Sequence, residues 1–456
     1  MKVVTRFAPS PTGKLHIGGA RTALFNFLFA KYHSGDFLVR IENTDKNRST
    51  IENVNSIIDS LNWLNLNSSQ KIIFQTENFQ RHQSVAFELL DKGFAYKCYL
   101  TENELEKLRI ESRKTGIPIR SPYRNKNSKK KHNNDFVIRL KMPSSGETII
   151  NDKVQGKVKI NNQILDDMVL LRKDKTPTYM LASVVDDYIM GISHIIRGDD
   201  HFNNAFRQIQ IIKYLNWPIP EYTHIPLIHG QDGAKLSKRH GAKNLIEYRE
   251  MGFDPIALKN YLLLLGYSFN SEKIYNFNED IFKFELKKIN KSPSRFDEIK
   301  LINVNSNFLK KADLSYLVTK IVKDKNLKNK KLITNLSYFL PELVKRYKLL
   351  NEIESDLNWM SDEFIINKEE NPIELKNKNN LKKISEVYQV LSTCDWELNN
   401  IKTSINKYIK DNNLMMKDVA PLIRLATTGK FNTPDIFNIL YILGKENCLN
   451  RLKNCL

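Results

Sequence analysis

The sequence predicts an α/β protein: a doubly wound parallel sheet near the N-terminus, followed by a largely helical half. Three observations indicate this fold. A short strand, an apolar-periodic helix and a second strand succeed one another at the N-terminus, which is the order that builds a parallel sheet. Alternation of helices and strands resumes after a middle region of short strands. Beyond residue 309, the apolar residues mostly follow the helical period.

The N-terminal elements are defined by apolar spacing and by the residues that interrupt it. Residues 2–7 predict a short buried strand, which Pro9 and Pro11 end. From Gly18 onwards, apolar residues recur at three- and four-residue steps, which is typical of a helix. The elements predicted here are a strand at 2–7, a helix at 18–32, a strand at 37–41, and helices at about 50–64 and 81–92.

The segment at about 96–175 has the character of an insertion. Short strands such as 135–140 and 164–171 alternate there with polar turns. Its basic run, 124–132, is compatible with an RNA contact, but a solvated loop is the simpler interpretation. Helix–strand alternation resumes at 178–196 and 203–215, and helices are predicted at 255–265 and over most of 309–456. The predicted domains are 1–95 with 176–230, 96–175, 231–308 and 309–456.

The composition restricts the class of protein. With 456 residues, the chain is longer than one core usually supports, so we expect several domains. A net charge of +20 favours a polyanionic partner, although genome composition alone can produce a chain rich in Lys, Asn and Ile. There is no apolar run of membrane-spanning length and no signal-peptide pattern, so we expect a cytoplasmic protein.

The four cysteines give no sign of a metal or disulfide framework. Cys98, Cys394, Cys448 and Cys455 form no C-x-x-C pair, and none lies beside a histidine at zinc-ligand spacing. We therefore expect reduced, mostly buried thiols.

A loop rich in proline and glycine, RFAPSPTGKLHIGGARTALFNF, joins the first strand to the first helix. Ligands bind at such junctions in doubly wound domains, and the free N–H groups of a helix N-terminus suit phosphate. Gly18 and Gly19 allow close approach to the backbone, and His16 can donate to phosphate oxygens. The loop matches neither the dinucleotide fingerprint nor the Walker A motif. Alternatively, Gly13 only shapes a turn and His16 is structural.

A second glycine-flanked loop, QDGAKLSKRHGA, follows much later in the chain. Lys235 and Lys238 are spaced so that both can reach a polyphosphate and neutralise charge that develops during transfer. Taken alone, the segment is better explained as a basic surface turn. The combination of the two loops decides between these interpretations.

The HIGG segment at 16–19 and the KLSKR segment at 235–239 resemble, in this order, the two signatures of class I aminoacyl-tRNA synthetases. Their surroundings, VRIENTD, PTYMLASVVDDYIMGISHIIRGDDH and KLSKRHGA, are similar to the bacterial glutamyl-tRNA synthetase family. The resemblance extends to VAPLIRLATTGKFNTPDIFNILYILGKE and covers nearly the whole chain. Glutaminyl relatives usually carry P-E-P-N-G where this chain has APSPTG, and they end in β-barrels. The short relative that glutamylates queuosine lacks a helical half.

The resemblance implies a glutamate-tRNA ligase. The four predicted domains become, in the order given above, a split Rossmann-type catalytic domain, an inserted acceptor-end domain, a stem-contact domain and a helical anticodon-binding region. Glutamate and ATP would form glutamyl-adenylate, and the glutamyl group would pass to the 3′-terminal adenosine of tRNA(Glu). The attacking carboxylate is already ionised, so this site needs alignment and charge stabilisation instead of a general base.

His16, Lys235 and Lys238 are the catalytic residues that the resemblance implies, with Mg²⁺ sharing the charge of the ATP phosphates. All three are present, which argues against an inactive RNA-binding paralogue. A tRNA-independent nucleotidyltransferase is the other alternative, although it would not need the helical half. The implied ATP-binding residues are Gly13, His16, Gly18, Gly19, Lys235, Ser237 and Lys238.

Two arginines are expected to recognise glutamate, because a guanidinium fork fits a carboxylate. By resemblance, Arg6 would hold the side-chain carboxylate, Arg197 the α-carboxylate, and Glu42 would meet the ammonium. Asp186 and Asp187 are expected to orient strands or cap a helix instead of binding metal. The implied glutamate-binding residues are Arg6, Ala8, Ser10, Glu42, Tyr179, Ser183, where some relatives have Asn, and Arg197.

The chain departs from its relatives at two places. Some hold a zinc ion near AYKCYL, but here only Cys98 remains and Leu100 replaces a second ligand, so no structural zinc is predicted. Leu357 stands where some relatives that accept only tRNA(Glu) have arginine, which opens tRNA(Gln) as an additional or alternative substrate. The implied tRNA-binding residues are Arg346, Leu357 and Arg424, and we expect a monomer without membrane contact.

Overall fold

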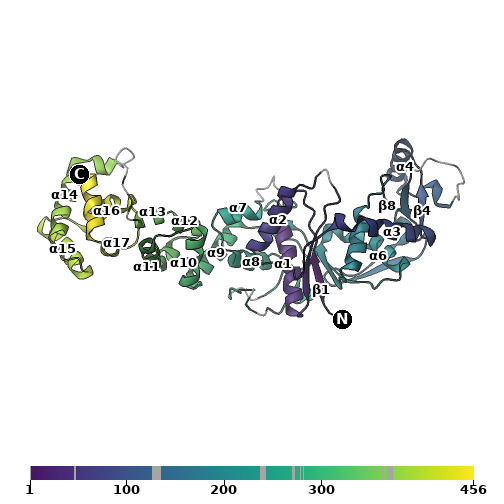
Figure 1. Ribbon diagram of the computed structural model, residues 1–456, viewed down its shortest axis with the longest axis horizontal. Helices are drawn as coiled ribbons and strands as arrows, with labels where there is room; N and C mark the ends of the chain where they lie inside the picture. Colours follow the sequence, from purple (N-terminus) through teal and green to yellow (C-terminus); the bar gives the residue numbers. More distant parts are fainter. Residues whose placement is uncertain are drawn as a thin grey trace. The chain divides into compact units, whose positions relative to one another are not determined.

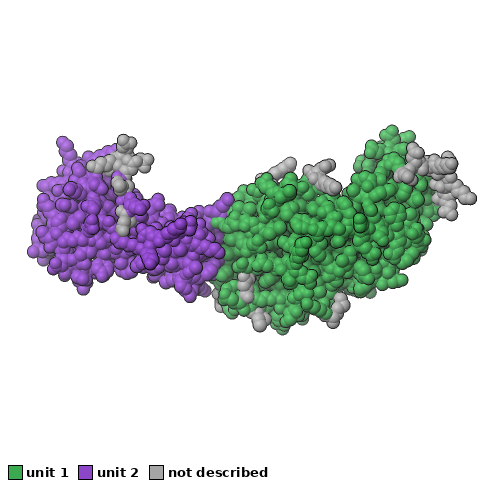
Figure 2. Space-filling model, viewed as in Figure 1, with its two compact units in different colours: residues 1–249, 255–301 green, residues 250–254, 302–456 purple. Residues whose placement is uncertain are grey.

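The computed structural model describes residues 2–45, 48–125, 135–236, 243–269, 273–277, 279–280, 282–361, 363–364, 366 and 373–456. The chain divides into two compact units, residues 1–249 with 255–301 and residues 250–254 with 302–456 (Figure 2). Every strand assigned in the described residues belongs to the first unit, and the second is built from helices. The predicted α/β class with a helical second half is therefore confirmed.

The first part of the chain forms the predicted parallel crossover. Strand β1 (Val4–Phe7) pairs in parallel with β2 (Asp36–Ile41), and helix α1 (Ile17–Tyr32) connects them (Figure 1). Strand β3 (Ile73–Phe74) extends the sheet on the other side of β2. Helix α1 is held in place because it buries much of its apolar surface, including Leu24 and Phe25, which are 0% exposed. The order of these three strands leaves the carboxyl ends of β1 and β2 at one edge.

A second set of strands continues this arrangement. Strand β9 (His194–Gly198) pairs in parallel with β10 (Glu221–Ile225), and helix α6 (Phe202–Tyr214) connects them. Strand β10 also pairs with β6 (Glu147–Asp152), which forms a hairpin with β7 (Gly156–Asn161). The amide of Ser193 donates to the carbonyl of Val4 at 3.0 Å, so β9 begins alongside β1. The carboxyl ends of β1, β2 and β9 consequently lie close together.

Helices cover these strands and share one apolar core with them. The core includes residues of α3 (Phe79–Asp91), α5 (Tyr179–Ile189) and α6. Each fully buried aliphatic side chain contributes about 1.5–3 kcal/mol relative to an exposed one. Since α5 and β9 carry several of the predicted site residues, this core fixes their positions.

The segment predicted as an insertion contains, together with Ala95, an antiparallel sheet of β4 (Ala95–Cys98), β5 (Val137–Leu140) and β8 (Val169–Leu171). The strand predicted at 164–171 was therefore too long. Residues Asn162–Ile164 form a 3-10 turn, and the following Asp167 is buried where its carboxylate accepts from Tyr96 and from the amide of Met142. Those hydrogen bonds to a buried acceptor favour a turn over continued strand pairing.

Helix α4 (Glu102–Thr115) was not predicted. It begins with a capping box between Thr101 and Glu104 and ends at Gly116, whose φ is +71°. None of its residues is buried, so the apolar periodicity that identified the other helices is weak here. The capping box and the C-terminal glycine are the sequence signals that could have located this helix.

The remaining elements of the first unit lie between or after these sheets. They are α2 (Ile51–Trp63), β11 (Ile228–His229), α7 (Leu245–Glu250), α8 (Pro255–Leu264), β12 (Ser294–Arg295) and, across the boundary between the units, α9 (Glu298–Lys311). Strand β11 pairs in parallel with β12. The second glycine-flanked loop follows β11 directly, so the pairing of β11 with β12 anchors its first residues.

The second unit is a series of helices (Figure 1). Its core contains Trp359, which is 0% exposed, and the buried Arg451, which donates to the carbonyl groups of Trp359 and Thr427 at 2.7 Å. Among the helices described, none is both long and apolar enough to cross a membrane. The helices are α10 (Leu314–Asp324), α11 (Lys330–Arg346), α12 (Leu350–Glu354), α13 (Leu357–Met360), α14 (Lys378–Ser392), α15 (Leu398–Asp411), α16 (Met416–Thr428), α17 (Ile436–Leu443) and α18 (Lys445–Cys455).

Candidate functional site

Charged side chains from three strand ends meet at the carboxyl edge of the sheet. Arg6 lies in β1, Glu42 directly follows β2, and Arg197 lies in β9. Their exposed fractions are 4%, 7% and 7%, although such residues are rarely buried without partners. Parallel strands place ligand sites at this edge. These three of the seven residues predicted to bind glutamate are thus brought to one edge from positions distant in the sequence.

Arg6 and Glu42 belong to one buried ion-pair network. Nε of Arg6 lies 3.1 Å from Oδ1 of Asp187, and Nη1 of Arg40 donates to the same oxygen at 2.6 Å. Nη2 of Arg40 donates to Oε1 of Glu42 at 2.9 Å. Burial raises the pKa of Glu42, and Arg40 opposes this effect. Burial also favours the neutral form of Asp187, but Arg6 and Arg40 outweigh it and lower the pKa of Asp187.

Arg40 is a residue that sequence reasoning missed. Its side chain is fully buried and pairs with carboxylates on both sides. The sequence signal was available, since Arg40 is the only charged residue within the apolar run of the second strand. Asp187 was expected to orient neighbouring elements, and its contacts with Arg6 and Arg40 agree with that role.

Arg197 has a different set of partners. Its Nε donates to Nε2 of His224 at 3.1 Å, its Nη1 to the hydroxyl of Tyr179 at 3.4 Å, and its Nη2 to the carbonyl of His201 at 3.3 Å. None of these three partners is a carboxylate. Burial, reinforced by Arg197, lowers the pKa of His224 to about 4, against the opposing effect of its hydrogen bond to Asp152. His224 and Asp152 were not foreseen from the sequence.

The other candidate glutamate residues lie around these arginines. Tyr179 begins α5 and its hydroxyl lies 3.2 Å from Nδ1 of His201. The hydroxyl of Ser183 donates to the carbonyl of Tyr179 at 2.8 Å and accepts from Gln208 at 2.7 Å. It is thus already engaged within the protein, and its contact with glutamate stays a prediction.

The segment that contains Ala8 and Ser10 follows β1 and runs beside the end of β2. The amide of Glu42 donates to the carbonyl of Pro9 at 2.9 Å, and the amide of Thr12 donates to the carbonyl of Ser10 at 2.9 Å. Ala8 is partly buried, whereas Ser10 is exposed. The backbone bonds hold this segment over the strand ends, where a small ligand could meet it.

His16 is the N-cap of α1. Its Nδ1 accepts from the amides of Gly18 and Gly19 at 3.1 and 3.3 Å, which satisfies two free donors of the helix. The surrounding protein partly removes water from the His16 ring, and this desolvation, together with the nearby charge of Lys235, lowers the pKa of His16. With Nδ1 acting as acceptor, the proton of the neutral ring resides on Nε2. The exposed ring is thus a hydrogen-bond donor beside a helix N-terminus.

The glycines of the first loop differ in their steric requirement. A Cβ on Gly18 would lie 3.0 Å from Cε1 of His16, and one on Gly19 would lie 2.6 Å from Cδ1 of Leu15. A Cβ on Gly13 would meet nothing within 4 Å. A side chain at Gly18 or Gly19 would therefore displace the His16 ring or the end of the Leu15 side chain, whereas packing alone does not require a glycine at Gly13.

The second loop begins next to the first. Nζ of Lys235 lies 3.1 Å from Oδ2 of Asp200, in the turn that follows β9. After the loop, the amide of Leu245 donates to the carbonyl of Leu15 at 2.9 Å. Both ends of the second loop are thus attached to the edge that carries His16. Ser237 and Lys238 lie outside the described residues.

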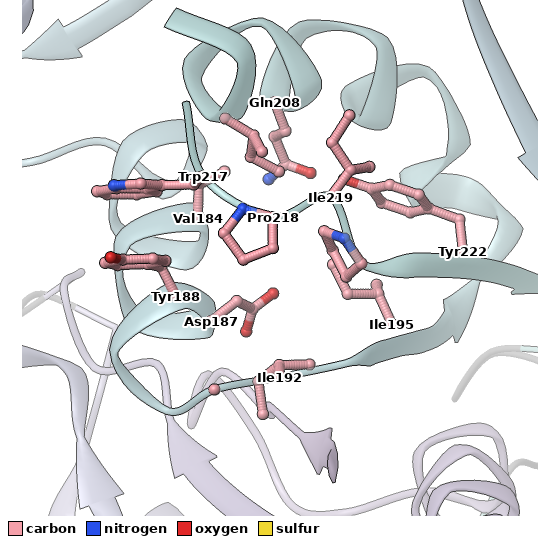
Figure 3. Close-up of a pocket in the computed structure, with 13 residues that line it drawn as sticks. Val184, Asp187, Tyr188, Ile192, Ile195, Gln208, Trp217, Pro218, Ile219 and Tyr222 are labelled. Atoms are coloured by element: carbon pink, nitrogen blue, oxygen red, sulfur yellow. The ribbon is translucent and has the colours of Figure 1, made fainter. Parts of the chain in front are cut away.

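A cavity of about 340 Å³ lies near the starts of β9 and β10, and Asp187 of the ion-pair network is among its lining residues (Figure 3). The rings of Tyr188 and Trp217 stack at one side, with centroids 3.9 Å apart. The only charged residue that lines it is Asp187, so it offers no cation for phosphate. We place the candidate ATP site at the two loops and not in this cavity. Its lining residues are Val184, Asp187, Tyr188, Gly191, Ile192, Ile195, Gln208, Ile212, Trp217, Pro218, Ile219, Pro220 and Tyr222.

The three candidate tRNA residues lie in different environments of the second unit. Arg346 is exposed and its Nη1 donates to Oδ1 of Asn432 at 3.2 Å. Leu357 is buried at the start of α13. Arg424 is partly buried, and its Nε has no hydrogen-bond partner among the described residues. Their contacts with tRNA stay predictions.

Cys98 is buried, with its thiol donating to the hydroxyl of Ser121 at 3.4 Å. Within the part of the chain that the structure describes, no group of three or more His, Cys, Asp or Glu side chains is arranged to hold a metal ion. The expectation that this chain has no structural zinc stays a prediction.

Comparisons with known proteins cover almost the entire chain. Residues 2–303 match the family described as "tRNA synthetases class I (E and Q), catalytic domain", and residues 332–456 match "Anticodon binding domain". Glutamate–tRNA ligase 2 of Parvibaculum lavamentivorans is 42% identical, covering 99% of this chain and 94% of the relative. The ligase of the same name from Zymomonas mobilis is 44% identical over 99% and 96%.

The fold is likewise similar to that of solved structures. A glutamate tRNA ligase from Elizabethkingia meningosepticum, crystallised in complex with its amino acid, superposes with a TM-score of 0.83 at 27% identity. The superposition covers 100% of this chain and 99% of that one.

Proposed function

This chain belongs to the class I tRNA synthetases of the E and Q family, and from that premise we propose that it is a glutamate–tRNA ligase. It activates glutamate with ATP and transfers the glutamyl group to the 3′-terminal adenosine of tRNA(Glu). The observation that carries the choice of amino acid is the meeting of Arg6, Glu42 and Arg197 at one edge of the sheet. This set offers two cations and one anion to a substrate with two carboxylates and one ammonium.

Selection of glutamate over glutamine rests on the arginines. A guanidinium can only donate hydrogen bonds, and the amide NH₂ of glutamine is also a donor. Binding glutamine would therefore leave a buried donor opposed to another donor, which a site built for a hydrogen-bonded substrate penalises strongly. Glu42 complements the ammonium group, since Arg40 keeps it oriented at the end of β2. Which arginine takes which carboxylate stays a prediction.

The two loops are proposed to handle ATP. An oxygen of the glutamate α-carboxylate attacks the α-phosphorus, the bond to the β-phosphate oxygen breaks, and pyrophosphate leaves. His16 donates from Nε2 to a phosphate oxygen, while Lys235 and Lys238 neutralise the charge on the leaving group. Mg²⁺ bound to the ATP phosphates would share that charge with the two lysines. Gly18 and Gly19 allow the nucleotide to approach the backbone.

The second step transfers the glutamyl group. The 2′-hydroxyl oxygen of the terminal adenosine attacks the carbonyl carbon of the adenylate, and AMP leaves with its electron pair as the hydroxyl proton is released. The anticodon-binding region, with its helical fold, supports a tRNA substrate over a free small molecule. We also propose a monomeric, cytoplasmic enzyme without structural zinc, to be tested by light scattering, fractionation and metal analysis of the purified protein.

The proposed function is tested by aminoacylation. The purified protein is expected to attach radiolabelled glutamate, but not glutamine, to tRNA(Glu) in the presence of ATP and Mg²⁺. A Lys238→Ala variant serves as the control and should lose most of this activity. Adenylylation of glutamate that proceeds identically with and without tRNA, with no charged product, would favour the nucleotidyltransferase alternative. Binding of tRNA without any charging would favour an inactive paralogue.

The range of tRNA substrates forms a separate proposal. Leu357 occupies the position at which some relatives restricted to tRNA(Glu) have arginine, and we propose that this chain also charges tRNA(Gln). Parallel assays with both purified tRNAs decide this point. Strict rejection of tRNA(Gln) would contradict the broader range while leaving the glutamate activity intact.

A further inference from the structure

The two arginines of the candidate glutamate site have partners of opposite kinds. Arg6 forms a direct ion pair with Asp187. The hydrogen bonds of Arg197 go to a histidine nitrogen, a tyrosine hydroxyl and a backbone carbonyl, all of which are uncharged acceptors. A cation without a paired anion retains more of its attraction for an incoming carboxylate. The neutrality of His224 is therefore important for the charge that Arg197 presents.

The tautomer of His224 is set by Asp152, which lies at the Nδ1 side of the ring, away from Arg197. Oδ2 of Asp152 lies 2.7 Å from Nδ1 of the His224 ring and also accepts from the His224 amide at 3.0 Å. Oδ1 of Asp152 accepts from the amides of Val154 and Gln155, both at 2.9 Å. Asp152 and His224 are 5% and 0% exposed. Each carboxylate oxygen thus faces donors only, and the hydrogen of the imidazole is held on Nδ1.

This arrangement leaves the lone pair of Nε2 to accept from Nε of Arg197, which is 3.1 Å away. The opposite tautomer would place two hydrogens between these nitrogens. We propose that Asp152 and His224 are positioning residues that fix the Arg197 guanidinium toward a carboxylate of the substrate. This inference rests on the proposed function, because the substrate of Arg197 is glutamate only if that function holds.

The origin of Asp152 adds a structural consequence. Strand β6, which ends at Asp152, lies in the segment predicted as an insertion, yet it pairs with β10 beside β9. The inserted part of the chain thereby contributes to the amino-acid site as well as to its own sheet. A shift in the register of β6 against β10 would move Asp152 away from His224. Neither His224 nor Arg197 would then be held in position.

The variant Asp152→Asn tests the chain of contacts. The introduced side-chain amide must point its NH₂ group either at the two loop amides that Asp152 binds or at His224. The second orientation is favoured, because it opposes only one fixed donor, the backbone amide of His224. Nδ1 then becomes the acceptor and the ring hydrogen moves to Nε2, against Arg197. We expect the KM for glutamate to rise about 10- to 100-fold, the usual consequence of losing a hydrogen bond to a charged group. The KM for ATP should change less than about twofold, since the nucleotide loops are not involved.

A direct readout of the tautomer accompanies the kinetics. Nitrogen-15 NMR of ligand-free protein labelled in histidine should show His224 protonated at Nδ1 in the wild type and at Nε2 in Asp152→Asn. The resonances are assigned by their loss in His224→Gln. A residue that only stabilised the fold would shift the unfolding midpoint without moving the ring hydrogen.

Three further variants separate positioning from stability. His224→Gln keeps an acceptor for Arg197 and a donor for Asp152, so it should retain most of the affinity for glutamate, whereas His224→Leu should lose it. Tyr96→Phe is the matched control, because Tyr96 is 5% exposed and its hydroxyl donates to the buried carboxylate of Asp167 at 3.0 Å, within the sheet of β4, β5 and β8. It should lower stability without a selective effect on the KM for glutamate.

Two results would overturn the inference: a wild-type ring protonated at Nε2, or equal increases of the KM values for glutamate and ATP in Asp152→Asn. Failure of the proposed function is distinguishable, because the wild-type protein would then charge no tRNA with glutamate under any of these conditions.

Discussion

Arg6 and Asp187 form an ion pair in which Nε lies 3.1 Å from Oδ1, and the same oxygen also accepts from Arg40 at 2.6 Å. One carboxylate thus joins the last turns of α5 to the carboxyl ends of β1 and β2. The pair is almost fully buried, with side-chain exposures of 5% and 9%. Its geometry leads to the first prediction.

Replacement of Asp187 by Asn should destabilise the protein and weaken glutamate binding together. Removal of one partner from a buried ion pair costs about 3–5 kcal/mol, because the remaining charges lack compensation. Urea unfolding should show this loss, and the KM for glutamate should rise as Arg6 reorients. The control is Glu147→Gln, which breaks the exposed pair with Lys159 and should change stability by less than about 1 kcal/mol. Equal effects of both variants would contradict the buried network described here.

His16 is expected to have two separable roles, in capping α1 and in donating to phosphate. Asn is a good N-cap residue, so His16→Asn should retain stability, whereas His16→Ala should lose about 1 kcal/mol. Both variants lack the Nε2 donor and should reduce kcat for aminoacylation by about 10²- to 10³-fold. Unfolding and steady-state kinetics on the same preparations check the two effects. An active His16→Asn enzyme would show that the ring serves only as a cap.

Gly18 and Gly13 should differ in their tolerance of alanine. The added Cβ of Gly18→Ala would lie 3.0 Å from Cε1 of His16, so the ring must shift by a few tenths of an ångström at its cap position. We expect Gly18→Ala to raise the KM for ATP or lower kcat by about tenfold, which corresponds to about 1.4 kcal/mol. The added Cβ of Gly13→Ala would lie in open space, so this variant should pack like the wild type and have the same stability. Comparable defects in both would mean that ATP itself approaches Gly13.

The stability of the first unit should depend on pH through His224. Its pKa is lowered to about 4 in the folded protein by burial and by Arg197, whereas an unfolded histidine titrates near 6.5. The unfolded chain therefore binds more protons as pH falls between these values, and stability is lost on acidification. Well above pH 6.5 the residue is neutral in both states and contributes no pH dependence.

The comparison of wild type with His224→Gln isolates this contribution. Between pH 8 and pH 5, the wild type should lose about 2 kcal/mol more of its free energy of unfolding than the variant. The charged and titratable groups that face the ring are Asp152 on β6, Arg197 on β9 and His201 before α6. Urea titrations at each pH measure the difference. Parallel pH profiles for the two proteins would contradict a buried neutral His224.

Local patterns were sufficient to predict most elements of the fold. Apolar spacing located α1, α2 and α3 to within a few residues. Helices α2 and α3 bury one apolar face that the sequence must encode, whereas α1 is apolar and buried on most sides. Apolar spacing did not identify helix α4, because this helix buries none of its residues. The length of β8 was overestimated because the buried hydrogen bonds of Asp167 end the strand pairing.

The sequence by itself determined the two loops, the family and the residue types suited to glutamate and ATP. Each motif is a contiguous stretch, so its residue types and spacing can be read directly from the sequence. Only the tertiary structure decided which residues support them. Arg40, Asp152 and His224 act through contacts with residues far away in the chain. Asp152 and His224 meet Arg197 only when β6, β9 and β10 adopt their register, and Arg40 of β2 meets Asp187 of α5 only in the folded domain. No local pattern encodes the result of that pairing.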